Sequence, residues 1–278
     1  MPGRRAGAIV ATMTEVSVRS GVGPLLRDWR RRRRRSQMDL ALDAGVSPRH
    51  VSFVESGRSR PSAEMVVRLA EQLEVPLRDR NELLLAAGYA PLYGERPLDD
   101  PDMTPVREAL ELVLRGHEPY PAAVVDRWWE MVAANSGIAL LTEGVADELL
   151  APPVNVMRVA LHPEGMAPRI VNFAEWRAHL LERLRHQASV TGDAALTALY
   201  EELSGYPAPP DADDHHGAGG EVFVPLVFRA ADGRELRFFS TVATFGTAVD
   251  ITVAELAIES FFPADSATAE ALRGAPPS

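Results

Sequence analysis

The feature that most constrains the fold is a closely spaced series of helix start and stop signals that begins at Ser36. Asp39 follows Ser36 by three residues, which makes a variant of the capping box that opens a helix. Gly45 permits a sharp turn after that helix, and Ser47 caps the next one. Gly57 then ends the second helix. The series predicts two short helices joined by a tight turn.

Further helices are expected on both sides of this pair. Residues 24–34 can form a helix whose apolar side chains share one face. Ser62 caps a later helix with apolar residues at i, i+3, i+4 and i+7, and a last helix spans residues 79–87. Together these elements predict an all-α five-helix bundle over residues 24–88.

A known family matches three stretches of this bundle. They are Gln37-x-x-Leu40-Ala41-x-x-Ala44-Gly45-Val46-Ser47, Val51-Ser52-x-x-Glu55-x-Gly57-Arg58 and Pro61-Ser62. On these residues the segment resembles the Xre-type (lambda-repressor-like) helix-turn-helix domains. The resemblance implies a double-stranded DNA operator as partner, with the second helix of the pair in the major groove. We also expect a homodimer, so that two half-sites are bound together.

The side chains of such a domain divide into base contacts and phosphate contacts. Arg49 can form two hydrogen bonds with a guanine edge, and Phe53 can meet a thymine methyl group. The resemblance places Gln37 at a position that hydrogen-bonds a phosphate. His50 fits a plain surface residue equally well. The predicted DNA-binding residues are Gln37, Arg49, His50, Ser52, Phe53, Arg58 and Arg60.

The charge of the chain is unevenly distributed. The formal net charge of −10, from 29 basic and 39 acidic residues, by itself argues against a nucleic-acid partner. Residues 1–70 hold 14 arginines against six acidic residues, a balance of +8, so the remainder carries −18. The run Arg30–Arg35 fits a solvated helix end and a phosphate contact about equally well. The asymmetry predicts one segment that meets a polyanion and another with a different role.

The composition excludes several classes of enzyme. The chain has no cysteine, which excludes disulfides, thiolate nucleophiles and Cys-based zinc modules. Every basic residue is arginine, which excludes a phosphate-loop lysine and a Schiff-base lysine. The cluster of metal-ligand type, His215-His216 with nearby aspartates, lies in an expected mobile loop. We therefore predict no catalytic residues, no metal site and no cofactor, and a protein that is not an enzyme.

The segments around the bundle have the composition of connecting chain. Residues 1–23 predict a disordered leader, in which Met13 is an alternative start. Residues 89–104 are rich in Pro, Asp and Gly and predict a linker. No apolar run approaches the length of about 18 residues that suggests a membrane span. We therefore predict a cytoplasmic protein with no membrane partner.

The remainder, residues 105–273, predicts an α+β domain with an antiparallel sheet. One hairpin is expected within residues 122–135, and a second one turns at Asp232-Gly233 between two strands. Helices are expected between the two hairpins. The chain is thus predicted to be multidomain, with an all-α part followed by an α+β part.

Local signals also predict where helices begin in this domain. Asn135 is placed to cap a short helix, and Asn172 is placed to cap a longer one. Thr252, with Glu255 three residues later, is expected to cap a closing helix.

A second family matches several stretches of this domain. They are Val124-Val125-Asp126-Arg127-x-Trp129-x-x-x-Ala133-Ala134-Asn135, Asn155-x-x-Arg158-x-x-Leu161-His162-Pro163, Asn172-x-x-Glu175-Trp176, Phe239-Ser240-Thr241 and Glu259-x-Phe261-Phe262-Pro263-Ala264-Asp265. On these residues the domain resembles the ligand-binding domain of MmyB-like transcription regulators. The resemblance implies a PAS-like fold that binds a small apolar ligand such as a fatty acid.

A half-open sheet with large apolar side chains can enclose an apolar cavity. Arg158 is a special candidate, because a buried arginine near a pocket needs an anion such as a carboxylate head group, although a surface ion pair is its default explanation. For the other candidates, core packing is the more common role. The predicted ligand-binding residues are Trp128, Trp129, Asn135, Met157, Arg158, Phe173, Trp176, Phe239 and Phe245.

The two resemblances together predict a sequence-specific DNA-binding transcription regulator whose C-terminal domain senses a small apolar ligand. Two alternatives stay open at this point. The C-terminal half can be a protein-interaction or dimerisation module without a ligand, or an unrecognised enzyme domain.

Overall fold

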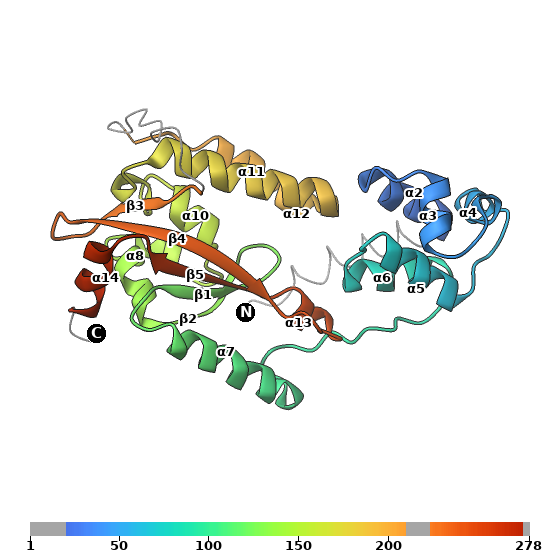
Figure 1. Cartoon of the computed structure of the whole chain (residues 1–278), viewed down its shortest axis with the longest axis horizontal. Coiled ribbons are helices and arrows are strands. Elements are labelled where there is room, and N and C mark those ends of the chain that lie inside the picture. Colours follow the sequence, from blue (N-terminus) through green and yellow to red (C-terminus); the bar gives the residue numbers. More distant parts are fainter. Residues whose placement is uncertain (1–20, 210–222, 275–278) are drawn as a thin grey trace, which may run out of the picture. The chain divides into compact units, whose positions relative to one another are not determined.

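The computed structural model describes residues 21–209 and 223–274, which divide into two compact units. The N-terminal unit comprises the described residues up to Arg96 together with Thr247–Ala254. The sheet unit comprises the described residues of Pro97–Gly246 and those from Glu255 onward. Figure 1 labels the elements of both. Most of the predicted leader, and the loop with His215 and His216, lie outside the described residues.

The described part of the N-terminal unit is built from helices, with one isolated β-bridge between Gly94 and Asp250. Its helices are α2 (Val22–Arg32), α3 (Gln37–Asp43), α4 (Pro48–Glu55), α5 (Ala63–Gln72), α6 (Leu77–Ala86) and α13 (Ile251–Ala254). The first five form the predicted bundle, with small shifts at its ends. The helix predicted from Pro24 begins at Val22, and the one predicted from Asp79 begins at Leu77.

The predicted caps of this bundle are confirmed. Ser36 Oγ accepts a hydrogen bond from the backbone N–H of Asp39, whose carboxylate accepts one from the backbone N–H of Ser36. Ser47 and Ser62 each accept a hydrogen bond from the backbone N–H three residues on. Such caps satisfy N–H groups that a helix leaves free at its start. The helices share one apolar core, whose most buried members include Leu26, Leu40, Ala41, Val51, Val54, Val66, Leu69, Ala70 and Leu83.

A segment from late in the chain completes the N-terminal unit. Asp250 is buried, and its Oδ2 lies 3.2 Å from Nη1 of Arg96. The backbone N–H of Ile251 donates to the carbonyl oxygen of Gly94 over 2.8 Å, and Ile251 is 2% exposed. The predicted closing helix is therefore wrong, because α13 has four residues and Asp250 caps the backbone N–H of Thr252.

The sheet unit is built on a five-stranded antiparallel sheet with the order β2-β1-β5-β4-β3. The strands are β1 (Ala122–Val125), β2 (Met131–Ala134), β3 (Leu226–Arg229), β4 (Glu235–Thr244) and β5 (Ala257–Pro263). Both predicted hairpins are confirmed, and Gly233 has the positive φ of 84° that its turn requires. The central strand β5 was not predicted. The α+β class with an antiparallel sheet, predicted from the order of hairpins and helices, is confirmed.

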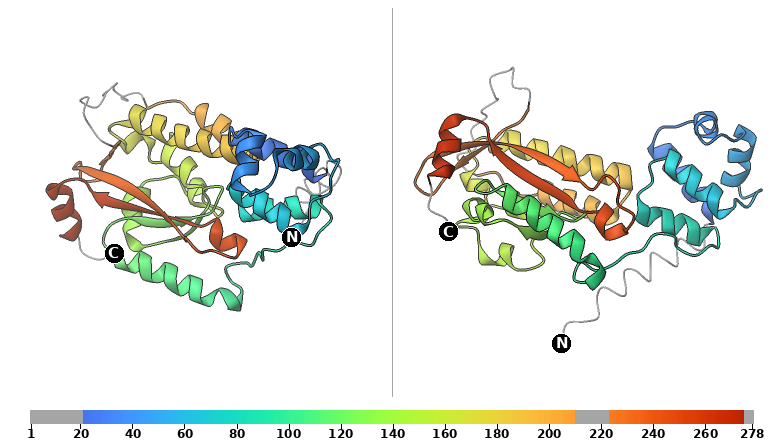
Figure 2. Two further views of the ribbon diagram at one scale, coloured as in Figure 1. Left: turned by 45° about the vertical axis from the view of Figure 1, so that its right-hand side comes forward. Right: turned by 60° about the horizontal axis from the view of Figure 1, so that its bottom comes forward.

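Helices cover both faces of this sheet (Figures 1 and 2). They are α7 (Thr104–Gly116), α8 (Ala139–Thr142), α9 (Asp147–Leu150), α10 (Val156–Leu161), α11 (Phe173–Thr191), α12 (Ala194–Ser204) and α14 (Ser266–Arg273), with short 3-10 turns at Pro101–Met103, Ser136–Ile138 and Ala167–Arg169. Helix α7 packs Leu110 and Leu114 against Val124 and Ile258 on one face. Helices α10–α12 cover the other face, over a larger core.

Asn135 and Asn172 stand where the helix starts were predicted, before the 3-10 turn Ser136–Ile138 and before α11, but neither side chain caps its helix, because longer-range hydrogen bonds take the side chains instead. Asn135 Oδ1 accepts from the backbone N–H of Ala122, and its Nδ2 donates to the carbonyl oxygen of Tyr120. Asn172 accepts from the backbone N–H of Val227, on β3, and so ties the start of α11 to the sheet. Both side chains are buried.

Candidate DNA-binding surface and ligand cavity

Helices α3 and α4 form the helix-turn-helix pair. Gly45 joins them with a φ of +65°, where a side chain would strain the backbone. On α4, Val51 and Val54 are each 1% exposed and fix the helix to the core. The opposite side of α4 is therefore turned outward, with its N-terminal end carried by the cap at Ser47.

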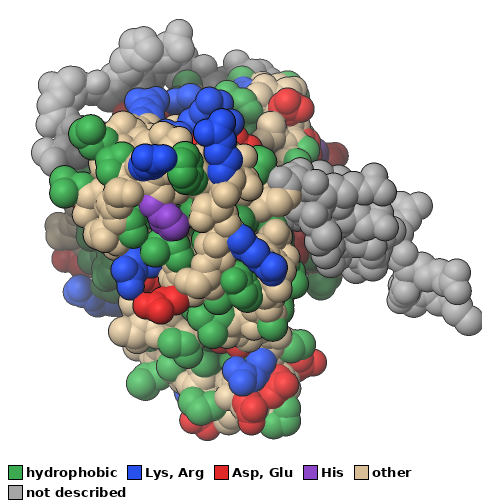
Figure 3. All heavy atoms as spheres, turned by 90° about the vertical axis from the view of Figure 1, so that its right-hand side faces the viewer, with side chains coloured by type: hydrophobic (Ala, Val, Ile, Leu, Met, Phe, Trp, Pro, Cys, Tyr) green, Lys and Arg blue, Asp and Glu red, His purple; other side chains and the backbone are tan. Residues whose placement is uncertain are grey.

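Three predicted DNA-binding residues lie together on the outer side of α4. The guanidinium carbon of Arg49 lies 5.1 Å from the centre of the Phe53 ring, and that of Arg58 lies 5.9 Å from it. We call Arg49, Phe53 and Arg58 the α4 face. Arg49 and Arg58 are exposed, while Ser52 and His50 beside them are half-buried. Figure 3 shows this end of the molecule, where arginine side chains gather near the top and acidic ones are sparse there.

Gln37 and Glu55 belong to a buried cluster behind this surface. Gln37 Nε2 donates to Glu55 Oε2 over 2.8 Å. Arg30 donates to both oxygens of the same carboxylate, over 2.6 and 2.9 Å. Burial opposes ionisation of Glu55, but the hydrogen bonds from Arg30 and Gln37 outweigh it and lower its pKa. The amide nitrogen of Gln37 thus already has an acceptor inside the unit.

Arg60 is also held by its own unit. Its Nη2 donates to the carbonyl oxygen of Ala87 over 3.1 Å, at the C-terminal end of α6. Its guanidinium carbon lies 5.6 Å from the centre of the Tyr89 ring. Arg58 and Arg60 are the predicted DNA-binding residues in the loop after α4, and of the two only Arg58 has its guanidinium on the α4 face.

In the run Arg30–Arg35, the side chains of Arg30, Arg33 and Arg35 make hydrogen bonds or ion pairs within the N-terminal unit. Arg33 donates to the carbonyl oxygens of Leu73 and Glu74, over 2.8 and 2.9 Å, at the end of α5. Arg35 pairs with Asp43. Arg30, Arg33 and Arg35 thus stabilise the fold, which neither explanation of the run predicted, whereas Arg31, Arg32 and Arg34 are exposed.

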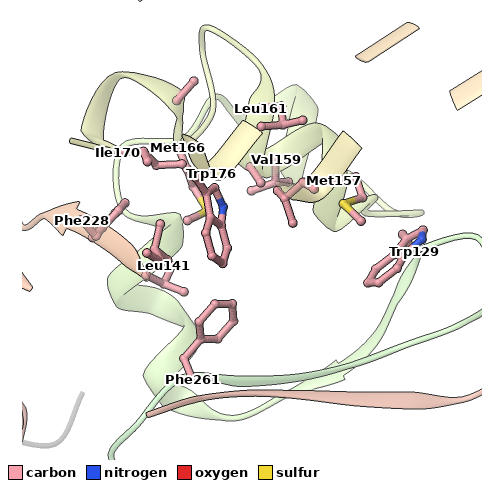
Figure 4. Packing of buried hydrophobic residues seen from close by; sticks show 14 of the residues in the cluster. Trp129, Leu141, Met157, Val159, Leu161, Met166, Ile170, Trp176, Phe228 and Phe261 are labelled. Carbon is pink, nitrogen blue, oxygen red and sulfur yellow. The ribbon is translucent and has the colours of Figure 1, made fainter. Parts of the chain in front are cut away.

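The sheet unit contains an apolar cavity of about 70 Å³ between the sheet and the helices that cover it. In Figure 4, the Trp176 ring from α11 points toward the sheet and the Phe261 ring from β5 points toward the helices. The lining residues are Ala123, Val125, Met131, Ile138, Leu141, Thr142, Val154, Val156, Met157, Val159, Ala160, Met166, Trp176, Leu180, Leu226, Glu259 and Phe261.

Four of the nine predicted ligand-binding residues lie at this cavity or in the core around it. Met157 and Trp176 line the cavity. Trp129 and Phe173 are buried in the same apolar core, and Trp129 Nε1 donates to the side-chain oxygen of Gln187. Trp129 has the unusual φ of +67° for a non-glycine residue, so its ring is placed by a constrained turn after β1.

The other five predicted residues do not line the cavity. Trp128 packs at the edge of the core and donates from Nε1 to Asp193. Phe239 stacks on Phe262, with ring centres 5.2 Å apart. Phe245 packs against the core under α7, and Asn135 holds backbone groups as described above.

Arg158, the fifth, forms a surface ion pair. Its Nε and Nη2 each lie 2.7 Å from an oxygen of Glu202, and both side chains are more than a third exposed. The hydrogen bond from Arg158 lowers the pKa of Glu202. Burial and the hydrogen bond to Glu202 raise the pKa of Tyr206 to about 12. The default explanation of Arg158 is therefore the one that the structure supports.

Glu259 and Phe261 are cavity residues that the sequence did not predict. Both lie on β5 and point to the same face, because strand residues two apart do so. The residues Glu259-Ser260-Phe261-Phe262 do not alternate between polar and apolar, so the sequence carries no two-residue period that would indicate a strand here. Among the described residues, no three His, Asp or Glu side chains gather as metal ligands.

No helix in the described ranges is both long enough and apolar enough to cross a membrane. Comparison with curated proteins gives no match. One solved structure, of an RNA-binding light-oxygen-voltage receptor, is 14% identical with a TM-score of 0.28; the match covers 96% of this chain but 63% of that one. The chain thus spans less than two thirds of that structure, and a score so low supports no conclusion about fold or function.

Two family models match the chain in the order that the structure shows. A helix-turn-helix model matches residues 26–79, over the bundle that carries the α4 face. The model of the MmyB-like transcription regulator ligand binding domain matches residues 106–275, which is more than half of the chain. This combination identifies a DNA-binding transcription regulator. The chain therefore belongs to the family of MmyB-like transcription regulators.

Proposed function

We propose that the α4 face contacts operator DNA and that the sheet unit binds a small apolar ligand, whose occupancy controls DNA binding. The apolar cavity is the observation that carries this proposal. It lies in the domain that the ligand-binding family model matches, and its walls are almost wholly aliphatic and aromatic. Such walls bind a ligand through burial of apolar surface.

The DNA half of the proposal rests on free positive charge at the α4 face. Within the described chain, neither Arg49 nor Arg58 pairs with a carboxylate, whereas Arg30 and Arg35 do. A guanidinium without an acidic partner can bind phosphate or a guanine edge without first breaking an ion pair. Arg49 lies at the start of α4, where helix-turn-helix proteins contact bases, and is assigned to base contact.

The ligand half rests on the apolar chemistry of the cavity. A cavity of about 70 Å³ is smaller than the roughly 300–1,000 Å³ of most ligand pockets, so the proposal requires the covering helices to move apart around a longer apolar chain. The fatty-acid type of ligand, which the family resemblance implies, has such a chain, and so does the corresponding alcohol. Occupancy regulates DNA binding only if the ligand binds one DNA-binding state more tightly than the other. We assign this role to a homodimer, whose two DNA-binding units contact two half-sites of the operator, because a ligand can change the spacing of the two units.

The DNA half is tested by selecting duplexes from a random library with the full-length chain and then measuring variants on the selected operator. Arg49→Ala should weaken operator binding by about 1–3 kcal/mol and reduce the preference at one base pair. Arg58→Ala should weaken binding to operator and random duplex alike. Arg115→Ala, on α7 and 73% exposed, is the matched control and should change neither. Equal losses on both duplexes for Arg49→Ala would contradict its assignment.

The ligand half is tested by native mass spectrometry of the purified chain before and after denaturation. A small apolar molecule should be released on denaturation, and adding it back to stripped protein should change operator affinity. If the stripped protein binds no apolar compound, the alternative of a ligand-free interaction module replaces the proposal. If it binds one without any change in operator affinity, the ligand has no regulatory role.

A further inference from the structure

The cavity wall contains one charged side chain among the described residues that line it. This residue is Glu259 on β5, and Thr142 is the other polar residue of the lining. The Glu259 side chain is 11% exposed, so its carboxylate is largely removed from water. A buried carboxylate is costly unless other groups compensate its charge. Its partners therefore determine which ligands can approach it.

Arg183 on α11 compensates the charge of Glu259. Its Nη1 donates to Glu259 Oε1 over 3.0 Å. The guanidinium carbon of Arg183 lies 4.3 Å from the centre of the Trp129 ring, a cation–π contact that fixes the position of the guanidinium. Arg183 is not part of the cavity lining. A ligand in the cavity thus meets the carboxylate before it meets the guanidinium.

His179 lies one helical turn before Arg183 and does not add a second positive charge. Burial lowers the pKa of His179, and the nearby Arg183 lowers it further, against the opposite effect of Glu259. The imidazole is therefore neutral at neutral pH. The polar corner, which we define as Glu259, Arg183 and His179, has one negative and one positive charge and no net charge.

This balance discriminates between head groups of apolar ligands. An ionised carboxylate beside Glu259 would place two negative charges against one arginine in an apolar cavity, which is unfavourable. A neutral hydroxyl leaves the balance intact and can donate a hydrogen bond. In the described residues, the Glu259 side chain accepts a single hydrogen bond, the one from Arg183, so its carboxylate has capacity for another.

We infer that Glu259 selects apolar ligands whose polar end is an uncharged hydrogen-bond donor, such as a primary alcohol, over ligands with an ionised carboxylate. This inference rests on the proposed function, because it assigns the head group of the ligand that the cavity holds. It also places Glu259, rather than Arg158, at the polar end of the ligand.

The test compares two homologous series on the full-length chain at neutral pH, primary alcohols and fatty acids of equal chain length. Titration calorimetry measures affinity, and the fluorescence of the tryptophans at the cavity gives a second signal. The wild-type chain should bind the alcohol at least about tenfold more tightly than the acid of the same length. Glu259→Gln should reduce this preference to below about threefold or reverse it, because a carboxylate can then pair with Arg183.

Glu202→Gln is the matched control, since it removes a carboxylate that pairs with an arginine away from the cavity and should keep the full preference. Arg183→Met is a second variant, which leaves Glu259 uncompensated and should increase the preference for the alcohol. Three outcomes would overturn the inference while leaving apolar binding intact. They are equal affinities of the wild type for alcohol and acid, a preference of the wild type for the acid, and an alcohol-to-acid affinity ratio that Glu259→Gln does not change. If neither series binds, the proposed ligand function fails and this inference fails with it.

Discussion

Both units contain a buried glutamate paired with an arginine, but the two carboxylates differ in how fully they are hydrogen-bonded. In the N-terminal unit, the side chain of Glu55 is 1% exposed and accepts hydrogen bonds from Arg30 at both oxygens and from Gln37. In the sheet unit, the side chain of Glu259 is 11% exposed, and among the described residues Arg183 is its one side-chain donor.

The difference separates a structural ion pair from the proposed binding site. The carboxylate of Glu55 accepts three hydrogen bonds from side chains of its own unit, so its effect is on stability. The carboxylate of Glu259 faces a cavity and has acceptor capacity left, so it can act on a ligand. The role of an arginine–glutamate pair thus depends on how many hydrogen-bond donors surround the carboxylate.

The largest expected effect on stability comes from removing the carboxylate of Glu55. Glu55→Ala leaves Arg30, whose side chain is 12% exposed, without its partner and should lower the free energy of unfolding by about 3–5 kcal/mol. Urea unfolding of the full chain, with hydrogen exchange of the α2–α4 amides, measures the loss. Glu64→Ala is the control, because its pair with Arg68 is exposed and worth less than about 1 kcal/mol. A similar loss of stability in both variants would show that the buried carboxylate contributes no more than an exposed one.

Acid should weaken the same cluster. Because the folded-state pKa of Glu55 is lowered, its stabilisation is complete above the ordinary glutamate pKa of about 4.3 and is lost as the pH falls through the lower folded-state value. Protection of the α2–α4 amides should therefore fall on acidification below about pH 4.3. The fall should be shallower in Glu55→Ala, and equal slopes would show that other carboxylates cause it.

Within the arginine run, the contribution to stability should depend on position. Arg33→Ala removes hydrogen bonds to two carbonyl oxygens at the end of α5 and should cost about 2 kcal/mol. Arg31→Ala, at an exposed position on α2, should change stability by less than about 0.5 kcal/mol. Denaturant unfolding measures both values. Equal losses in the free energy of unfolding would support the interpretation of the run as a solvated basic helix end.

Removing the carboxylate of Glu259, which accepts one side-chain hydrogen bond among the described residues, should affect stability much less. Glu259→Gln should lower the free energy of unfolding by no more than about 1 kcal/mol, because Arg183 is 24% exposed and can reach water. Thermal unfolding of the unliganded chain checks this value. A loss as large as that of Glu55→Ala would show that the pair at the cavity is structural after all.

The smallest effect is expected at the surface pair of the sheet unit. Arg158→Gln should reduce stability by less than about 1 kcal/mol, because Arg158 and Glu202 are both well exposed. Affinity for apolar ligands should not change, since Arg158 does not line the cavity. A clear loss of ligand affinity in this variant would restore Arg158 as a ligand-binding residue.

Sequence reasoning succeeded where the determining interactions are local. The caps at Ser36, Ser47 and Ser62 involve partners three residues away, so their spacing alone predicts the helix starts. The turn at Gly233 is local in the same sense. The arginine run shows the limit, because the partners of Arg33 lie about forty residues further on and no local pattern indicates them.

The missed features depend on pairing between distant segments. Strand β5 is central because it pairs with β1 and β4, and Thr252 and Glu255 just before it imitate a helix cap. Asn135 and Asn172 carry local cap signals too, but tertiary hydrogen bonds took their side chains.

Strand register also explains why Phe239, one of the predicted ligand-binding residues, does not line the cavity. Phe238 and Phe239 are neighbours on β4, and a strand sends successive side chains to opposite faces. Phe238 is fully buried in the larger core, whereas Phe239 stacks on Phe262. Register, which the aromatic composition does not reveal, determines which of the two can approach the cavity side.

The placement of Thr247–Ala254 in the N-terminal unit has a consequence for how these regulators can be rearranged. A single cut near Arg96 would strip the first part of the chain of Asp250 and Ile251, which are buried against it. Recombination that joins this helical bundle to a foreign sensor would lose the same eight residues unless the sensor supplied an equivalent segment. Two separate parts of the gene therefore encode the N-terminal unit. We expect substitutions in one part to be matched by substitutions in the other.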